Sequence, residues 1–412
     1  MQKINIFFRV IVSLMVTLPL LFVSCETVDD EMFRDRTPLK HSLTFLATNL
    51  ETANAVEGVT VYLSESRVSE ENIVFTDSTK TNSEGIAEIS VVSGDYIYKV
   101  KGEGYADLPE ESFPLRGTDK DFAISMLRIY NVAFSVVDNL NAPLANALIT
   151  VGDESIYTNS EGQVEVKFPA GDNLFRVKSA DNSFYPVGGT FFVSGDLNVT
   201  MKLVPKTVTT FDDIDGNTYN IVQIGELTWM EGDLKTTKYS DGSDVTFPAT
   251  NGAWAANIDG AYAYPNGSVD NVALLGLLYN WHAVANVKGL APANWHVATN
   301  DEWNELEAFV MSDGHNETEG TALKSSTGWK AGSLPNTDDY GFNVKAPGRR
   351  KTNGQFANFT AMSRIWTSTG TEDTAMARWF ANNKEVISHL DGDAKAWGYS
   401  VRCIMDCELI VN

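Results

Sequence analysis

A five-residue segment that occurs twice constrains the fold of this chain more than any other feature. Thr81–Gly85 reads Thr-Asn-Ser-Glu-Gly, and Thr158–Gly162 repeats it unchanged at an offset of 77 residues (158 − 81). A fixed long offset indicates two copies of one structural module in tandem. Apolar and polar residues alternate within each copy, which is typical of strands with one buried face, and the glycine fits a turn with positive φ. The sequence therefore predicts two all-β sandwich domains, residues 41–127 and 128–205.

The two copies differ in length upstream of this segment. Val59–Val61 corresponds to Ile149–Val151 at an offset of 90 residues (149 − 59), so the first copy carries 13 additional residues (90 − 77). These residues fall between about Tyr62 and Lys80. We expect them to form a long hairpin or a loop.

The order of motifs in each copy resembles the carboxypeptidase regulatory-like, or transthyretin-like, β-sandwich. In the first copy the strand Val59–Val61 is followed by the Thr-Asn-Ser-Glu-Gly turn and then by Gly94–Tyr96, which leads into a further strand. The resemblance covers both predicted sandwiches. It implies modules that act as stalks or spacers rather than as ligand-binding domains.

The chain changes character after Pro205. All nine tryptophans lie between Trp229 and Trp397, in a glycine-rich half that mixes short strands, loops and helical patterns. Its motifs, in order, are Phe211–Tyr219, Trp229–Leu234, Gly276–Val284, Trp295–Trp303, Trp366–Ser368 and Gly398–Cys403. Together they resemble the Fibrobacter succinogenes major paralogous domain (FISUMP) family across about residues 211–406. The resemblance implies no known molecular function and a C-type-lectin-like fold, so we predict a multidomain protein with two all-β sandwich domains followed by an α+β, C-type-lectin-like domain, residues 206–412.

Two segments of this last domain have helical spacing. Thr299 and Glu302 form a capping box ahead of apolar residues spaced as on one helix face from Trp303 to Val310,. The segment Leu274–Val284 has similar spacing, although Gly276 interrupts it. We expect a helix in each.

The first 25 residues have the pattern of a lipoprotein signal peptide. Lys3 and Arg9 precede an uncharged apolar run, Val10–Val23, which is too short to span a bilayer and ends close to Cys25. The pattern resembles the lipobox of bacterial lipoproteins, in which residues 1–24 are removed and the cysteine is lipidated. An ordinary secretory signal is the alternative.

Residues 25–40 read as an acidic tether. The Glu and Asp residues that follow Cys25 resemble the export signal of surface lipoproteins of Bacteroidota, and a solvated linker is the alternative interpretation. We therefore expect an outer membrane protein that is lipid-anchored and faces the cell exterior.

The chain is strongly acidic. Its 31 basic and 54 acidic residues give a net charge of −23, or −25 (29 − 54) once the two basic residues of the signal are removed. This charge repels nucleic acid, so we expect contact with the membrane through the anchor, a glycan or protein ligand, and no nucleic acid. After lipidation of Cys25 only Cys403 and Cys407 remain, and both a disulfide between them and a buried, reduced Cys403 fit the sequence.

Three tryptophans are the candidates for ligand contacts. Trp254, Trp329 and Trp397 lie in polar segments flanked by glycine or alanine, and an exposed indole ring can stack on a sugar. The other tryptophans lie in apolar motifs and are expected in the core.

Two motifs suggest a metal but lack the full ligand set. His282 and His296 could bind a transition metal only with a third ligand, which the spacing does not supply,. Asp213–Asn217 begins like a calcium loop, but an EF-hand also needs a glutamate at its twelfth position and flanking helices. We therefore predict a β-turn there, with no metal and no cofactor.

An enzymatic alternative comes from a second resemblance. Thr299–Trp303 and Gly398–Cys403 also look like elements of formylglycine-generating enzymes, which need a reactive cysteine pair upstream of the terminal strand. No cysteine lies between Cys25 and Cys403, so we predict no catalytic residue and a non-catalytic binding head. The other alternative is a structural component of the envelope or of a pilus tip, whose sandwiches would pair with neighbours through strand edges.

Overall fold

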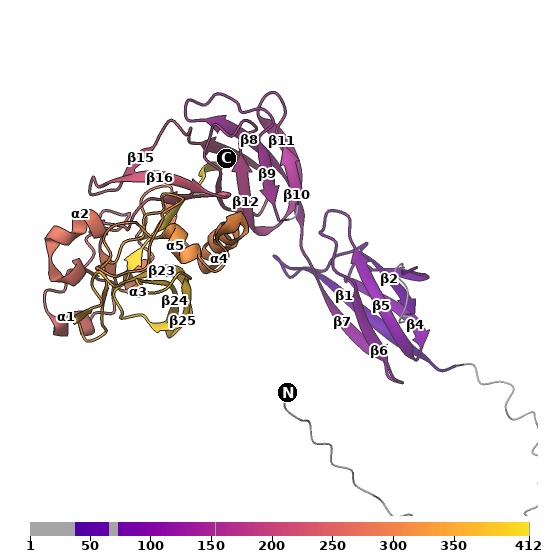
Figure 1. Cartoon of the computed structure of the whole chain (residues 1–412). Coiled ribbons are helices and arrows are strands. Elements are labelled where there is room, and N and C mark those ends of the chain that lie inside the picture. The colour runs from indigo at the N-terminus through magenta and orange to yellow at the C-terminus, as the bar shows by residue number, and fades with distance from the viewer. Residues whose placement is uncertain (1–37, 66–72, 153, 412) are drawn as a thin grey trace, which may run out of the picture. The chain divides into compact units, whose positions relative to one another are not determined.

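The computed structural model describes residues 38–65, 73–152 and 154–411 and divides into two compact units (Figure 1). The first holds the described residues up to Glu103 together with Asp107–Met126, and the second holds Gly104–Ala106 and all residues from Leu127 onward. Cys25 and most of the acidic tether lie outside the described residues. Among the helices that are described, none is both long and apolar enough to cross a membrane.

The first unit is a sandwich of two sheets. Its strands are β1 (Lys40–Asn49), β2 (Thr60–Glu65), β3 (Asp77–Lys80), β4 (Ile86–Val92), β5 (Gly94–Lys101), β6 (Glu111–Leu115) and β7 (Lys120–Met126). One sheet has the order β4-β1-β7 and the other β3-β2-β5-β6. Alternate side chains of β1, including Leu43 and Phe45, are fully buried, and the Phe45 ring stacks on Phe122 at 4.7 Å.

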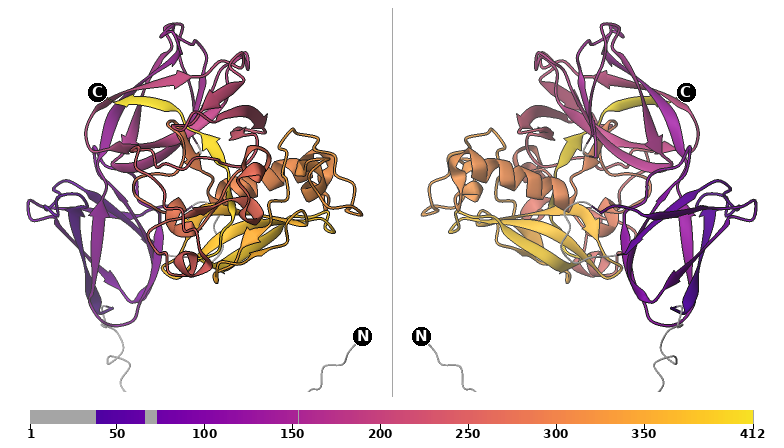
Figure 2. Two further views of the ribbon diagram at one scale, coloured as in Figure 1. Left: turned by 90° about the vertical axis from the view of Figure 1, so that its left-hand side faces the viewer. Right: turned by 90° about the vertical axis from the view of Figure 1, so that its right-hand side faces the viewer.

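A sandwich of the same strand order begins the second unit. Its strands are β8 (Ile129–Asp138), β9 (Leu148–Val151), β10 (Glu154–Tyr157), β11 (Gln163–Pro169), β12 (Gly171–Lys178), β13 (Val187–Val193) and β14 (Leu197–Leu203). The chain's last strand, β28 (Glu408–Val411), completes the sheet β11-β8-β14-β28, opposite the sheet β10-β9-β12-β13. In Figure 2 this yellow strand lies among the magenta strands of the sandwich.

The repeated segment makes the same turn in both sandwiches. The Thr81 hydroxyl donates to the Val56 carbonyl at 2.7 Å and accepts from the Val59 amide at 2.9 Å. In the second copy the Thr158 hydroxyl makes equivalent bonds at the same two distances. The 13 additional residues of the first copy fall between Tyr62 and Lys80, and so include the ends of β2 and β3 as well as their connection. The two strands pair as an antiparallel hairpin. The predicted hairpin is therefore confirmed at its two described ends.

The rest of the second unit, from β15 onward, is built on two further sheets. Its strands are β15 (Thr210–Asp212), β16 (Thr218–Ile224), β17 (Leu227–Met230), β18 (Tyr262–Ala263), β19 (Leu278–Tyr279), β20 (Trp295–Val297), β21 (Arg349–Arg350), β22 (Phe356–Ala357), β23 (Met362–Gly370), β24 (Thr374–Ala381), β25 (Ser388–Ala394), β26 (Ser400–Val401) and β27 (Cys403–Met405). The sheet orders are β15-β16-β17-β27-β20 and β25-β24-β23-β26. Short helices fill the connections: α1 (Asn251–Ala255), α2 (Val272–Leu275), α3 (Trp281–Val284), α4 (Asn300–Val310) and α5 (Glu319–Leu323).

The capping box at the start of α4 is confirmed. The Thr299 hydroxyl accepts from the Glu302 amide, and the Glu302 carboxylate accepts from the Thr299 amide at 2.8 Å. Most of the predicted apolar face packs inward, with Trp303 fully buried against the rings of Trp229 and Phe342. Phe309, which the same pattern included, is exposed. The packing of Trp303 attaches α4 to the strands that it covers.

The helix predicted over Leu274–Val284 is wrong as one element. Gly276 has φ 69° and separates α2 from the short strand β19 and from α3. A Cβ at this glycine would lie 2.7 Å from the Asp233 carbonyl oxygen. The close approach of that backbone, which ordinary helical spacing cannot reveal, breaks the helix here.

Candidate functional site

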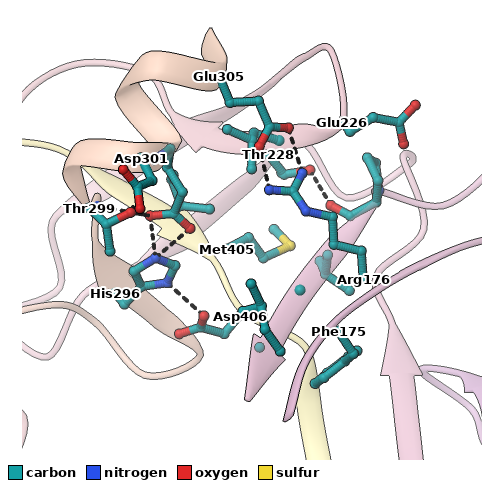
Figure 3. Close-up of a pocket in the computed structure, with 18 of the residues that line it drawn as sticks. Phe175, Arg176, Glu226, Thr228, His296, Thr299, Asp301, Glu305, Met405 and Asp406 are labelled. Carbon is teal, nitrogen blue, oxygen red and sulfur yellow. Dashed lines mark hydrogen bonds and ion pairs between the residues drawn. The ribbon is translucent and has the colours of Figure 1, made fainter. Parts of the chain in front are cut away.

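A cavity of about 600 Å³ lies where the second sandwich meets the rest of its unit. One wall comes from β12 and β13, and the other comes from β17, β27 and the first turns of α4 (Figure 3). It is lined on the sandwich side by Phe175, Arg176, Gly188, Gly189 and Thr190, and on the other side by Glu226, Thr228, His296, Asp301, Glu302, Glu305, Met405 and Asp406. Both walls belong to one compact unit.

His296 is held between two carboxylates at the edge of this cavity. Its Nδ1 lies 2.7 Å from Asp406 Oδ1, and its Nε2 lies 2.9 Å from both carboxylate oxygens of Glu302. A carboxylate accepts and does not donate, so both ring nitrogens must carry a proton. The imidazole is therefore a cation with both of its donors used.

The pKa values agree with this arrangement. Burial alone would lower the pKa of His296, but the hydrogen bonds to Asp406 and Glu302 outweigh it and raise the pKa to about 10. Burial pushes the pKa of Glu302 upward, and the bonds from His296 and Thr299 lower it overall. At neutral pH His296 is thus protonated and is no general base.

Charged pairs cross from one wall to the other. The Arg176 guanidinium donates to both carboxylate oxygens of Glu305, at 2.6 and 2.5 Å, and Figure 3 shows it pointing toward that side chain. The Lys178 ammonium lies 3.0 Å from the Glu226 carboxylate. Each pair is partly exposed and therefore contributes modestly to stability. Both pairs join side chains of the second sandwich to side chains of the later part of the unit.

Carboxylates outnumber cations in the lining of the cavity. Five carboxylates line the cavity, against the cations Arg176 and His296, so it is acidic. Asp301 is exposed and has no hydrogen-bond or ion-pair partner among the described residues, so its carboxylate is available to accept from a ligand. The arrangement suits a ligand that brings hydroxyl or ammonium donors.

Neither remaining cysteine supplies a nucleophile. Cys403 and Cys407 are both buried free thiols, so the reduced, buried alternative holds and they form no disulfide. Burial raises the pKa of each thiol far above neutral pH, and the nucleophilic form of cysteine is the thiolate. The described ranges contain no group of three or more His, Cys, Asp or Glu side chains placed to hold a metal.

The turn predicted over Asp213–Asn217 is confirmed. The Asp213 carboxylate accepts from the backbone amides of Asp215 and Asn217, at 3.0 and 2.9 Å, and from the Tyr219 hydroxyl at 2.7 Å. His282 lies on α3 and is not among the residues that line the cavity. The two histidines named from the sequence therefore do not share this site.

The expectation that Trp254 is exposed is wrong. Its side chain is 1% exposed, its Nε1 donates to the Ala396 carbonyl at 3.1 Å, and the Arg350 guanidinium lies 4.5 Å from the ring centroid. A Cβ added to Gly398 would lie 2.9 Å from the ring. The contacts that cover this tryptophan come from segments about 100 to 140 residues later, so its small neighbours in sequence give no sign of them.

Trp329 and Trp397 are partly exposed and do not line the cavity. The Trp329 Nε1 donates to the Val344 carbonyl at 3.2 Å, and the Lys324 ammonium lies 5.4 Å from its ring centroid. The Arg349 guanidinium lies 4.5 Å from the Trp397 ring centroid. The three tryptophans named from the sequence thus form no common site.

Sequence patterns did not single out Arg176, Glu305 or Asp406, which the fold brings to the cavity. One signal was present: Arg176 occupies the repeat position of Lys99 (99 + 77). In the first sandwich that lysine lies over the Phe75 ring, whereas the arginine meets a carboxylate that only the second unit supplies. When two copies of a repeat carry different residues at one position, that position can mark a contact between one copy and a segment outside the repeat.

Comparison with known families identifies the C-terminal half. Residues 222–405, which are 184 (405 − 222 + 1) of the 412 residues, match the model of the Fibrobacter succinogenes major domain. None of the curated proteins compared with the sequence matches it.

Similar solved structures are distant. A streptococcal ancillary pilin is 14% identical over 41% of this chain, with a TM-score of 0.27. The Bacillus anthracis TIE protein is 16% identical over 47% of this chain, with a TM-score of 0.21. The chain spans only 63% and 42% of these two proteins. GBS52, the minor pilin of Streptococcus agalactiae, is 14% identical, with 40% of this chain and 96% of the pilin covered and a TM-score of 0.25.

Proposed function

We propose that this chain, whose residues 222–405 form a Fibrobacter succinogenes major domain, is a surface-displayed binding protein without catalytic activity. Cys25 carries a lipid anchor in the outer membrane, and the acidic tether leads outward from it. The first sandwich, residues 41–127, is a spacer, and the second, residues 128–205, is a spacer that also supplies one wall of the cavity. The predicted head, residues 206–412, is lectin-like up to its last strand, β28, which belongs to the sheet of the second sandwich. The head contacts a glycan or a protein outside the cell.

The observation that carries this proposal is the protonated His296 held between Glu302 and Asp406. Its two hydrogen bonds fix the cavity wall before any ligand arrives, and preorganisation of this kind favours binding. A histidine that keeps its proton at neutral pH cannot accept one from a substrate. The site is thus built for recognition through hydrogen bonds.

Asp301 is the residue through which we test this site. The soluble chain from residue 26 onward is screened on an array of neutral and amino sugars, because the isolated head would leave β28 without β14. We expect Asp301→Asn to weaken binding at least tenfold, since an amide is a poorer acceptor than a carboxylate. Glu88→Gln, on the exposed face of β4, is the matched control.

Two results contradict the assignment of a glycan ligand to this cavity. In one, no sugar binds to a chain whose melting temperature shows that it is folded. In the other, a sugar binds and Asp301→Asn leaves its affinity unchanged.

A second function, assembly with neighbours, is favoured by β7. Within the described residues this strand pairs only with β1, so one of its backbone edges is open, and an open edge can accept a strand of another protein. Sedimentation across a range of concentrations tests this function. If assembly occurs, the double variant Ala123→Lys and Ser125→Lys should abolish it, because lysines on an edge strand oppose pairing.

A further inference from the structure

A cluster of arginine and aromatic side chains lies away from the cavity. We call Arg349, Arg364, Trp379, Trp397 and Tyr399 the arginine–aromatic cluster. Arg364 on β23 pairs in register with Trp379 on β24, so both side chains point to one face of the sheet. Thr369, on the same strand, lines the cavity, and five residues of strand separate the two places by about 16 Å.

Aromatic rings hold both guanidinium groups in place. Arg349 lies 4.5 Å from the Trp397 ring centroid. Arg364 lies 5.4 Å from the centroids of Trp379 and Tyr399. Such cation–π contacts fix the planes of the guanidinium groups, so their N–H donors have set directions.

The charges of the cluster are only partly balanced. Arg364 donates to the Asp393 carboxylate at 3.1 Å, and the Tyr399 hydroxyl donates to the same carboxylate at 2.6 Å. No carboxylate among the described residues forms an ion pair with Arg349. Burial first, and then the charge of Arg364, lower the pKa of Arg349. The cluster thus holds two guanidinium cations and one carboxylate.

Three buried donors of the cluster lack an acceptor. In the part of the chain that the structure describes, the Nε atoms of Arg349 and Arg364 and the Nε1 atom of Trp379 have no hydrogen-bond partner. Buried N–H groups are nearly always paired. A further cation, the Lys384 ammonium, lies 4.2 Å from the Trp379 ring centroid. Among the described residues the cluster therefore has more N–H donors than acceptors.

We propose that the arginine–aromatic cluster binds the carboxylate of an acidic sugar, such as a uronic acid. A guanidinium fork matches a planar carboxylate with two parallel hydrogen bonds, and the partly exposed Trp397 offers an apolar ring beside it for the sugar. The whole chain carries a charge of −23 and repels anions at long range, so an acidic ligand must be held by this local concentration of cations. The site is separate from the cavity and goes beyond the function proposed for it.

Titration with tri-galacturonate tests this inference, with affinity measured by calorimetry on the chain from residue 26 onward. Arg349→Gln should weaken binding at least tenfold, and Arg349→Lys, which keeps the charge but loses the fork, should weaken it by less. Arg116→Gln removes the same charge from an exposed pair with Asp95 in the first unit and should change nothing. Asp301→Asn should also leave tri-galacturonate binding unchanged.

Neutral galactotriose, a sulfated disaccharide and a tetraglutamate peptide complete the test. Galactotriose binding that equals tri-galacturonate binding would overturn the proposal, as would an Arg349→Gln variant of unchanged affinity. Tighter binding of the sulfated sugar or of the peptide would overturn the assignment to a sugar carboxylate. If Arg349→Gln lowers the melting temperature, the comparison is made with Arg349→Lys, and unchanged affinity in that variant contradicts the proposed fork.

Discussion

The two sandwiches share their turn and their strand order up to the last strand, and they differ in what lies beside that strand. In the first, β7 pairs only with β1 among the described strands; in the second, the equivalent β14 pairs with both β8 and β28. The two strands correspond at the repeat offset, because Lys120–Met126 plus 77 is Leu197–Leu203. One module is therefore left as an independent unit and the other is closed by the far end of the chain.

One hydrophobic core runs through both parts of the second unit. A single cluster of buried side chains runs from Val132 in the second sandwich to Tyr279 and Cys407. The first sandwich lies in a separate unit. The sandwich whose edge is filled by β28 therefore shares a unit with the C-terminal domain, whereas the sandwich whose edge is open among the described strands forms a unit of its own.

Deleting residues 408–412 should have the largest effect. It removes four paired positions between β14 and β28, and at about 1 kcal/mol for each strand hydrogen bond the second unit should lose about 4 kcal/mol of stability. Chemical denaturation followed by tryptophan fluorescence reports on the second unit, which holds all nine tryptophans. A variant that unfolds at the same denaturant concentration as the parent would show that β28 does not support this unit.

Alanine substitution at each turn glycine should destabilise one unit and leave the other unchanged. A Cβ at Gly85 would lie 2.4 Å from the Ala47 carbonyl oxygen, and one at Gly162 would lie 2.7 Å from that of Val136. Both glycines have positive φ, so we expect Gly85→Ala to cost about 3 kcal/mol and Gly162→Ala about 2 kcal/mol, each in its own unit only. Calorimetry should show one transition shifted in each variant. If both transitions move together, the units are not independent.

His296→Asn should give the smallest effect and one that depends on pH. The pKa of His296 is raised to about 10 from an ordinary value of 6.5, so its contribution is complete below pH 6.5 and is lost as pH rises toward 10. Because the side chain is 35% exposed, solvent screening limits the contribution to about 1 kcal/mol at pH 7.

The matching measurement is the difference in stability between the parent and the variant. Lys324 acts in the opposite direction, because burial lowers its pKa from 10.5 to about 8 and stability therefore rises with pH across that interval. Lys324 is present in both proteins, so its contribution cancels in the difference in stability between them. This difference should shrink between pH 7 and pH 10, and a constant difference would contradict the protonated state assigned to His296.

The predictions that succeeded rest on local chemistry. The two Thr-Asn-Ser-Glu-Gly turns and the capping box of Thr299 are closed by bonds between residues near one another in sequence. The mainly β, multidomain character followed from alternation and repeats, and the Fibrobacter succinogenes major domain was recognised from its motifs. Such features can be predicted because their cause lies within a short segment.

The failures rest on contacts between distant segments. Gly276 breaks a helix because the Asp233 backbone passes beside it, and Trp254 is buried by Arg350 and Gly398. β28 and β14 lie about 200 residues apart in the sequence, and the residues Glu408–Val411 do not indicate which strand they pair with. The cavity and the arginine–aromatic cluster are assembled in the same way, which is why neither was visible in the sequence.

Hydrogen exchange of the unmodified chain tests the central comparison most directly. Amides of Val199–Lys202 that face β28 should exchange at least about 100-fold more slowly than the outward-facing amides of β7, because only the former are paired on that side. Equal and rapid exchange in both strands would show that the chain's end does not close the second sandwich. Equal and slow exchange would show that the β7 edge is not open.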